Sequence, residues 1–372
     1  MTKQLFKNTI FGLASVCLLV FGGTLISAAD KTVEYTSVQQ VFQDESAQQD
    51  FRLQGEYTAE YDGQKLGLQL IADGGGKFRS VVYIGGLPGD GWNPGELRIF
   101  GKAEISGENG LKIELAKTNP QYDSISTPQK LEAIFKIEQR EQSQREQNRR
   151  GLRRLVIETK YQGNSIVFTK TARRSSTFNA KAPEGAAVLF DGTNLDQFLP
   201  GARINETEGR LGKFLWSEAQ TKPFDIDRPY ALHIEFLTSY MPTARGQGRS
   251  NSGVYINEAY ECQVLDSFGL ELANNECGGF YQIKAPDVNV SYPPLTWQTY
   301  DIDFVPPKYD GDKKVTNAKV SVKQNGVTIH KDLELPHQTP GRKDEKHEPR
   351  GLYLQGHGNN VQYRNIWLKY ND

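Results

Sequence analysis

Two short segments in the second half of the chain combine residue types that can transfer protons or bind hydroxyl groups. The segment YECQVLD predicts a strand whose alternation places Glu261 and Gln263 on one face, with Tyr260 and Cys262 on the other. A carboxylate within an apolar strand is costly to bury unless it is paired, so we expect Glu261 either to meet a cation or to lie in a site open to water. A proton-accepting or hydroxyl-binding role is one interpretation, and a structural ion pair with an arginine such as Arg364 is the other.

The second segment lies close to the carboxyl end of the chain. Residues 352–357 alternate apolar and polar side chains, which predicts a half-buried strand with Tyr353, Gln355 and His357 on one face. Histidine titrates near neutrality, so His357 is a candidate acid or base. Neutral hydrogen-bonding groups beside an aromatic ring would suit contact with a sugar. An ordinary exposed strand face is the alternative.

Two further residues could contribute to a site. Arg364 lies in the next predicted strand, where an arginine needs an acidic partner or a ligand oxygen. Asn251 begins another strand and could bind a sugar or shape a turn. The sequence contains no H-x-x-x-H pair, no G-x-S-x-G and no EF-hand loop, so a zinc hydrolase, an α/β-hydrolase serine and a calcium loop are unsupported.

The composition is typical of a soluble globular protein, with 37% hydrophobic and 24% charged residues. The formal net charge of −1 gives no electrostatic basis for binding nucleic acid. The 36 glycines and 17 prolines, together with 17 tyrosines and 18 phenylalanines, predict many short strands and turns, and hence an all-β fold. Cys262 and Cys277 could form a disulfide in an oxidising compartment or remain as two buried thiols.

Residues 1–29 have the pattern of a secretory signal peptide. Lys3 and Lys7 precede an apolar stretch over residues 10–21, and small residues at 27–29 provide a cleavage site. We therefore predict a periplasmic or secreted protein with no transmembrane span after cleavage. An uncleaved membrane anchor is the alternative.

The rest of the chain divides into two β-rich parts. Residues 31–53 are polar and suggest a helical lead-in, after which glycine-punctuated runs predict hairpins in an N-terminal domain over residues 30–182. Its charged run at residues 138–154 suggests a solvated hairpin tip or helix. A linker rich in small residues precedes a second domain at 187–370, whose many strands and Asn325-Gly326 turn predict a sandwich or jelly roll.

Six segments of the second domain occur in an order that resembles a known family. They are LFDGTNLDQF, NSGVYI, YECQVLD, GGFYQIKAP, WQTYDIDF and LQGHGNNVQYRNIWL. Together they resemble the bacterial 3-keto-disaccharide hydrolase family, also described as 3-keto-glucoside 1,2-lyase/3-keto-2-hydroxy-glucal hydratase domains. This resemblance implies a concanavalin A-like lectin/glucanase jelly roll. The N-terminal half looks like an extra domain that some members carry.

The resemblance also implies an exported enzyme that acts on an oligosaccharide or 3-keto-glycoside. A base removes the proton at C2, the oxygen at C1 leaves, and water adds to the double bond. Glu261 or His357 would be the base, and Arg364 or a bound divalent cation would stabilise the enolate. The substrate-binding candidates are Gln263, Gln355, Asn251, Tyr281 and Asp266. A non-catalytic carbohydrate-binding protein or an envelope scaffold with a lectin-like fold is the alternative.

Overall fold

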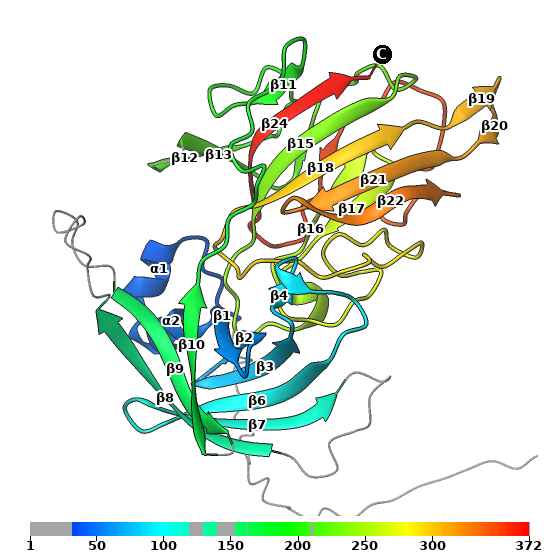
Figure 1. The fold of residues 1–372 in the computed structure, drawn as a ribbon. Coiled ribbons are helices and arrows are strands. Elements are labelled where there is room, and N and C mark those ends of the chain that lie inside the picture. Colours follow the sequence, from blue (N-terminus) through cyan, green and yellow to red (C-terminus); the bar gives the residue numbers. More distant parts are fainter. Residues whose placement is uncertain (1–31, 119–128, 140–152, 162, 210–211, 372) are drawn as a thin grey trace, which may run out of the picture. The chain divides into compact units, whose positions relative to one another are not determined.

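The computed structural model describes residues 32–118, 129–139, 153–161, 163–209 and 212–371 (Figure 1). About 49% of the chain is strand and 6% is helix, so the predicted all-β class is confirmed. The predicted signal peptide and most of the charged run at 138–154 lie outside the described residues. None of the helices in the described ranges is long and apolar enough to cross a membrane.

Two short helices precede the first strand, in the region where the sequence suggested a helical lead-in. Helix α1 spans Val38–Gln43 and helix α2 spans Glu45–Leu53. The Ser37 side chain caps α1, and the Asp44 side chain caps α2 by accepting from the backbone of Ser46.

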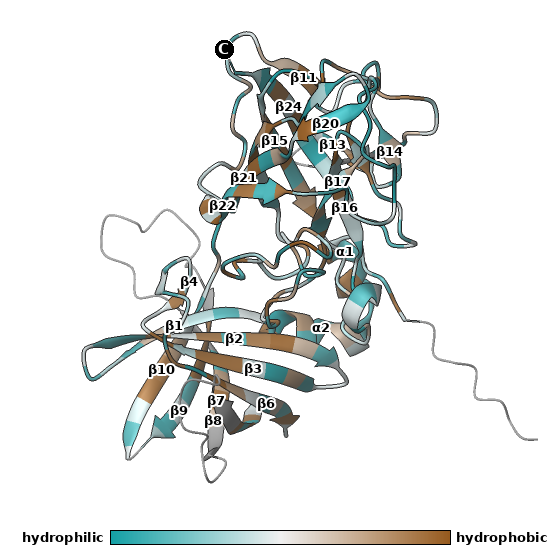
Figure 2. Ribbon diagram, turned by 90° about the vertical axis from the view of Figure 1, so that its right-hand side faces the viewer, coloured by the Kyte–Doolittle hydropathy of each residue, from teal (hydrophilic) through white to brown (hydrophobic). Residues whose placement is uncertain are grey.

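Eight antiparallel strands of the N-terminal half close into a barrel. In order around the barrel they are β1 (Gly55–Tyr61), β10 (Asn164–Thr171), β9 (Arg153–Tyr161), β8 (Gln129–Gln139), β7 (Gly110–Thr118), β6 (Arg98–Ser106), β3 (Lys77–Ile84) and β2 (Gln64–Gly74). Strand β2 is largely hydrophobic, and β3 is hydrophobic over part of its length (Figure 2). The barrel core includes Leu68 and Leu70, together with Leu53 of α2.

The glycine-rich segment after β3 is a tight turn cluster, as its sequence predicts. It contains the two-residue strands β4 (Leu87–Pro88) and β5 (Gly91–Trp92). Gly86 has a φ of 130°, and a Cβ atom there would lie 2.3 Å from the carbonyl oxygen of Asp90. Only glycine permits this close backbone approach.

The second half of the chain forms two sheets. The larger has the order β12 (Ile204–Gly209), β13 (Gly212–Trp216), β24 (Gln362–Tyr370), β15 (Tyr230–Leu237), β18 (Gln298–Val305), β21 (Ala318–Gln324) and β22 (Val327–Leu335), with β11 (Ala187–Phe190) also paired to β24. The smaller has the order β14 (Ala219–Gln220), β23 (Tyr353–Leu354), β16 (Ser252–Ile256) and β17 (Tyr260–Val264). A short ribbon, β19 (Lys308–Asp310) with β20 (Lys313–Thr316), extends from the region between β18 and β21.

A single hydrophobic core lies between these two sheets. Ile234 and Phe236 of β15 belong to the same buried cluster as Val254 of β16 and Val264 of β17. This packing of two sheets fits the predicted sandwich. Cys262 and Cys277 are both buried and both free, so the structure favours the thiol alternative over the disulfide.

The turn between β21 and β22 confirms one local prediction. Asn325 and Gly326 have φ angles of 54° and 83°, which are the left-handed values that a two-residue hairpin turn requires. The division of the chain into domains at 30–182 and 187–370 stays a prediction.

Candidate active site

The hairpin formed by β16 and β17 supplies the central residues of the candidate site. Glu261 pairs with Tyr255, and Gln263 pairs with Gly253. Residues directly opposite each other in an antiparallel pair share a face of the sheet, so these four positions lie on one side. The intervening Cys262 belongs to the hydrophobic core.

A pocket of about 240 Å³ lies over this face of the hairpin. Six of the eight residues predicted from the sequence line it: Glu261, Gln263, Asn251, Tyr281, Gln355 and His357. The structure therefore brings both candidate bases, Glu261 and His357, to one hollow. The strand predicted at residues 352–357 is shorter than expected and spans only Tyr353–Leu354. Gln355 nevertheless stays beside β16, because its backbone N–H donates to the carbonyl oxygen of Gly253 at 2.9 Å.

The remaining lining residues were not predicted from the sequence. They are Gln247, Tyr255, Asn275, Pro340 and Gly341. Tyr255 could have been found, because a hairpin from NSGVYI to YECQVLD places it opposite Glu261. Gln247 and Asn275 lie in loops, where no periodicity indicates which way a side chain points.

Glu261 is 3% exposed and has no ion-pair partner among the described residues. Its backbone N–H donates to Oγ1 of Thr339 at 2.8 Å, while its Oε1 atom has no hydrogen-bond partner there. Burial raises the pKa of the Glu261 carboxyl to about 7, against a smaller opposing effect of the Tyr255 hydroxyl. A carboxyl group with this pKa can accept a proton at neutral pH and return it.

Gly253 gives Glu261 the space that it occupies. A Cβ atom at this position would lie 2.1 Å from Oε1 of Glu261 and 2.8 Å from its Cγ and Cδ atoms. The glutamate side chain therefore lies across the backbone of the neighbouring strand, where any side chain larger than hydrogen would displace it.

Four buried oxygen atoms of the pocket residues lack a hydrogen-bond partner within the described part of the chain. They are Oε1 of Glu261, Oε1 of Gln263, Oδ1 of Asn251 and Oε1 of Gln355. All four are acceptors, provided that Glu261 is ionised. These four acceptors would suit a ligand that brings several donors, as the hydroxyl groups of a sugar do.

Hydrogen-bond donors lie in the more exposed part of the lining. His357 is exposed, and Tyr281 and Asn275 are half-buried. The pocket thus combines a buried set of acceptors with side-chain donors that are closer to solvent. A reaction that removes a proton from carbon and protonates a leaving oxygen needs both kinds of group.

Arg364 does not reach this pocket, contrary to its predicted role as enolate stabiliser. Its Nη1 lies 3.4 Å from Oε2 of Glu235, and its Nη2 donates to Oδ1 of Asn179 at 2.8 Å. The pairing of β24 with β15 shifts register between His233 and Glu235, and Asn365 has a φ of 46°. This register shift is a β-bulge. It places Arg364 on the face of the large sheet that points away from the hydrophobic core. The alternative ion pair between Arg364 and Glu261 is therefore also wrong.

Asp266 is the second predicted site residue that lies elsewhere. It follows the end of β17, is 1% exposed, and its Oδ2 lies 2.6 Å from Nη2 of the buried Arg249. The carboxylate is thus occupied by a buried ion pair and is not free to contact a substrate in this pocket. Within the described ranges, no group of three or more His, Cys, Asp or Glu side chains is arranged to hold a metal ion.

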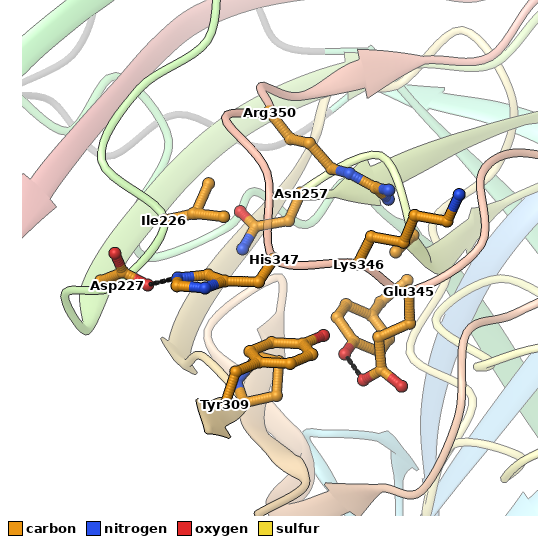
Figure 3. A pocket seen from close by; sticks show the side chains of 11 residues that line it. Ile226, Asp227, Asn257, Tyr309, Glu345, Lys346, His347 and Arg350 are labelled. Carbon is orange, nitrogen blue, oxygen red and sulfur yellow. Dashed lines mark hydrogen bonds and ion pairs between the residues drawn. The ribbon is translucent and has the colours of Figure 1, made fainter. Parts of the chain in front are cut away.

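A second hollow, of about 20 Å³, is lined by residues of the loops around 226–227 and 345–350 (Figure 3). Two of its charged groups pair with each other, and Glu345 and Arg350 form ion pairs with Lys314 and Glu348, which lie outside the lining. Nε2 of His347 lies 2.8 Å from Oδ1 of Asp227, and Glu345 accepts from the Tyr260 hydroxyl. This volume suits about one water molecule, so the hollow is too small for a sugar ring.

Taken together, the β-sandwich and the acceptor-rich pocket with its buried glutamate define a carbohydrate-active enzyme domain. Residues 185–369 match the model of the family described as the 3-keto-alpha-glucoside-1,2-lyase-like domain. This half of the chain belongs to the 3-keto-disaccharide hydrolase family, as its motifs predicted.

Two crystal structures from Parabacteroides distasonis ATCC 8503, each described as a "putative glycosyl hydrolase", are similar to about half of the chain. The first is 26% identical in sequence, with a TM-score of 0.44, and the match covers 50% of this chain and 84% of the chain in the crystal structure. The other is 17% identical with a TM-score of 0.28, over 53% of this chain and 93% of its own. The family assignment depends on neither. No curated protein matches the chain.

Proposed function

We propose that the C-terminal half of the chain cleaves 3-keto-glycosides by elimination and hydration. The observation that carries this proposal is Glu261, a buried carboxyl group with a pKa of about 7 and an unpartnered oxygen atom in the pocket. A ketone at C3 acidifies the proton on C2, and a base of this strength is suited to remove it at neutral pH.

In the first half of the reaction, the Glu261 carboxylate takes the C2 proton and the electron pair moves toward the C3 oxygen. The resulting enolate collapses to a C1–C2 double bond as the C1–oxygen bond breaks, and the leaving oxygen takes a proton. His357 is the proposed donor of that proton, and the hydroxyl of Tyr281 is the proposed donor to the enolate oxygen. Both residues line the pocket with Glu261.

In the second half, water adds to C1 and gives its proton to His357, while Glu261, whose carboxyl proton has by then exchanged with solvent, protonates C2. The net change is hydrolysis with a solvent-derived proton at C2. The unpartnered oxygens of Asn251, Gln263 and Gln355 would hold the sugar hydroxyls throughout. We further propose that the protein is exported; this proposal is supported only by the signal-like pattern of residues 1–29.

The test is to incubate the purified protein with 3-keto-trehalose in D₂O and to follow glucose release. The 3-keto-glucose product should carry deuterium at C2 at early times, above the level of non-enzymatic exchange. Replacement Glu261→Gln should remove turnover, whereas Glu271→Gln, the same change at an exposed loop glutamate, should not.

Because no step uses a metal, a chelator should leave the rate unchanged. Release of glucose without C2 labelling would indicate direct hydrolysis and contradict the proposal.

A non-catalytic carbohydrate-binding role remains the alternative, since the same acceptor oxygens would serve a binding protein. That role predicts saturable binding of the sugar without product, by the wild-type protein as well as by the Glu261→Gln variant.

A further inference from the structure

Gln247 occupies a position from which it orients two other amides of the pocket. It lies in the short 3₁₀ helix Gly246–Gly248, in the loop between β15 and β16. Its Nε2 donates to the backbone carbonyl oxygen of Asn275 at 2.8 Å. A carbonyl oxygen can only accept, so this bond determines which end of the Gln247 amide is oxygen and which is nitrogen.

The oxygen of the Gln247 amide consequently faces two donors. Its Oε1 accepts from Nδ2 of Asn251 at 3.1 Å and from Nε2 of Gln263 at 3.3 Å. Nδ2 of Asn251 also donates to the backbone oxygen of Gln247 at 3.0 Å. With both nitrogens held in this way, the amide oxygens of Asn251 and Gln263 become the unpartnered acceptors of the pocket.

The third amide is oriented by a separate chain of bonds. The Tyr255 hydroxyl donates to the carbonyl oxygen of Pro340 at 2.9 Å, and so accepts from Nε2 of Gln355 at 3.4 Å. Oε1 of Gln355 is therefore also left without a partner. Because these bonds do not involve Gln247, a change of its side chain should release the amide of Gln263 and weaken the hold on that of Asn251, which keeps its bond to the backbone oxygen of residue 247.

We infer that Gln247 is a positioning residue that turns the amide oxygens of Asn251 and Gln263 toward the pocket, and that the pocket, whose buried part thus presents mainly acceptors, selects neutral, polyhydroxylated sugar rings over acidic ones. This inference rests on the proposed function, and it specifies which class of sugar the pocket binds. Ring hydroxyls supply donors to the oxygens of Asn251, Gln263 and Gln355. The carboxylate of an acidic sugar brings only further acceptors next to Glu261, and is repelled.

The first test measures steady-state kinetics on a 3-keto-glucoside. Replacement Gln247→Met keeps a similar volume but removes both the donor and the acceptor, so the amide of Gln263 can turn its nitrogen toward the substrate, while Asn251 keeps only its bond to the backbone oxygen of residue 247. We expect KM to rise about tenfold while kcat stays within about twofold. Replacement Gln247→Glu keeps acceptor oxygens for both amides and should recover part of the affinity. Gln43→Met, the same change at an exposed residue of α1, is the control.

The second test does not require turnover. Calorimetry should show that the wild-type protein binds methyl α-glucoside at least tenfold more tightly than methyl α-glucuronide, and that Gln247→Met narrows this ratio. Neither ligand has a keto group, so this result is independent of whether the elimination mechanism is correct. Equal affinity of the wild-type protein for both glycosides, or no binding of either, would overturn the inference. An unchanged ratio of the two affinities in Gln247→Met would also overturn it. A fall of kcat in parallel with thermal stability in that variant would show that the role of Gln247 is purely structural, and would overturn the inference as well.

Discussion

Nη2 of Arg249 lies 2.6 Å from Oδ2 of Asp266, and each residue is only 1% exposed. The guanidinium also donates from Nε to the backbone oxygen of Asp266 at 3.1 Å. Removing one member of a buried pair leaves the other charged and unpaired, so we expect Arg249→Met to lower the free energy of unfolding by about 3–5 kcal/mol. Urea denaturation measures this change. The double variant Arg249→Met/Asp266→Leu should recover most of the loss, and a single variant within about 1 kcal/mol of the wild-type protein would contradict the prediction.

This pair also explains why Asp266 was misplaced by the sequence. The alternation that correctly put Glu261 and Gln263 on one face puts Asp266 near the other face, with Cys262. Its selection as a substrate-binding residue therefore depended on the motif YECQVLD and not on periodicity. The partner, Arg249, lies in a different loop, and no local pattern connects the two.

Arg364 was misplaced for a different physical reason. By simple alternation it should face the same way as Ile366 and Leu368, which lie in the core. The bulge at Asn365 inserts one residue, and so turns Arg364 to the other side of the sheet. Strand positions were predictable because they depend on local periodicity. The closure of the barrel and the placement of a bulge depend on the register between distant strands, which periodicity does not specify.

The raised pKa of Glu261 predicts opposite pH dependences for activity and stability. Burial raises this pKa to about 7, so kcat/KM should rise as pH increases toward 7 and level off above it. The folded protein binds this proton more tightly than the unfolded chain, in which the pKa of a glutamate is about 4.3. The free energy of unfolding should therefore fall as pH rises from about 4.3 to about 7. Replacement Glu261→Gln should lower kcat by about 10²–10⁴-fold and remove this part of the pH dependence of stability. A variant that keeps both pH profiles would exclude Glu261 as the base.

The proposed role of His357 as proton donor predicts a dependence on the leaving group. A poor leaving group, such as the glucose of 3-keto-trehalose, needs a proton, whereas 4-nitrophenolate leaves without one. We expect His357→Gln to lower kcat by about 10²-fold on the first substrate and by much less on the 4-nitrophenyl 3-keto-glucoside. Equal losses on both substrates would instead indicate that His357 acts at C2 or in binding. Because His357 is exposed, its replacement should leave the thermal stability of the protein unchanged.

His233, which the sequence did not single out, predicts a second pH effect on stability. Nδ1 of this buried ring lies 2.6 Å from Oδ1 of Asp301, Nε2 lies 3.5 Å from Oε1 of Glu235, and the ring stacks on Trp367. Burial opposes the charged form, but the hydrogen bonds to Asp301 and Glu235 outweigh it and raise the pKa of His233. Arg364, paired with Glu235, is the nearby positive charge on β24.

A raised pKa in the folded state means that protonation of His233 stabilises the protein fully below the unfolded-state pKa of about 6.5. This contribution is lost as pH rises through the higher folded-state value. The difference in melting temperature between the wild-type protein and His233→Gln should therefore be largest in mildly acidic buffer and should shrink at alkaline pH. Thermal unfolding at a series of pH values measures it. A difference that stays constant from pH 6 to pH 9 would show that His233 contributes through packing on Trp367 alone.

Gly253 offers the most direct test of whether the position of Glu261 matters. In Gly253→Ala the new Cβ atom would require the Glu261 carboxyl group to move, because it would otherwise lie 2.1 Å from Oε1. The backbone pairing of Gly253 with Gln263 does not depend on a side chain, so the fold should persist with a small change in thermal stability. A displacement of about 1 Å at a reacting group costs on the order of 10²-fold in rate, so we expect kcat to fall by about that factor. Gly248→Ala is the matched control, since a Cβ atom there meets nothing within 4 Å. If Gly253→Ala retained full kcat, the Glu261 carboxyl group would tolerate displacement and could not be the base that its position indicates.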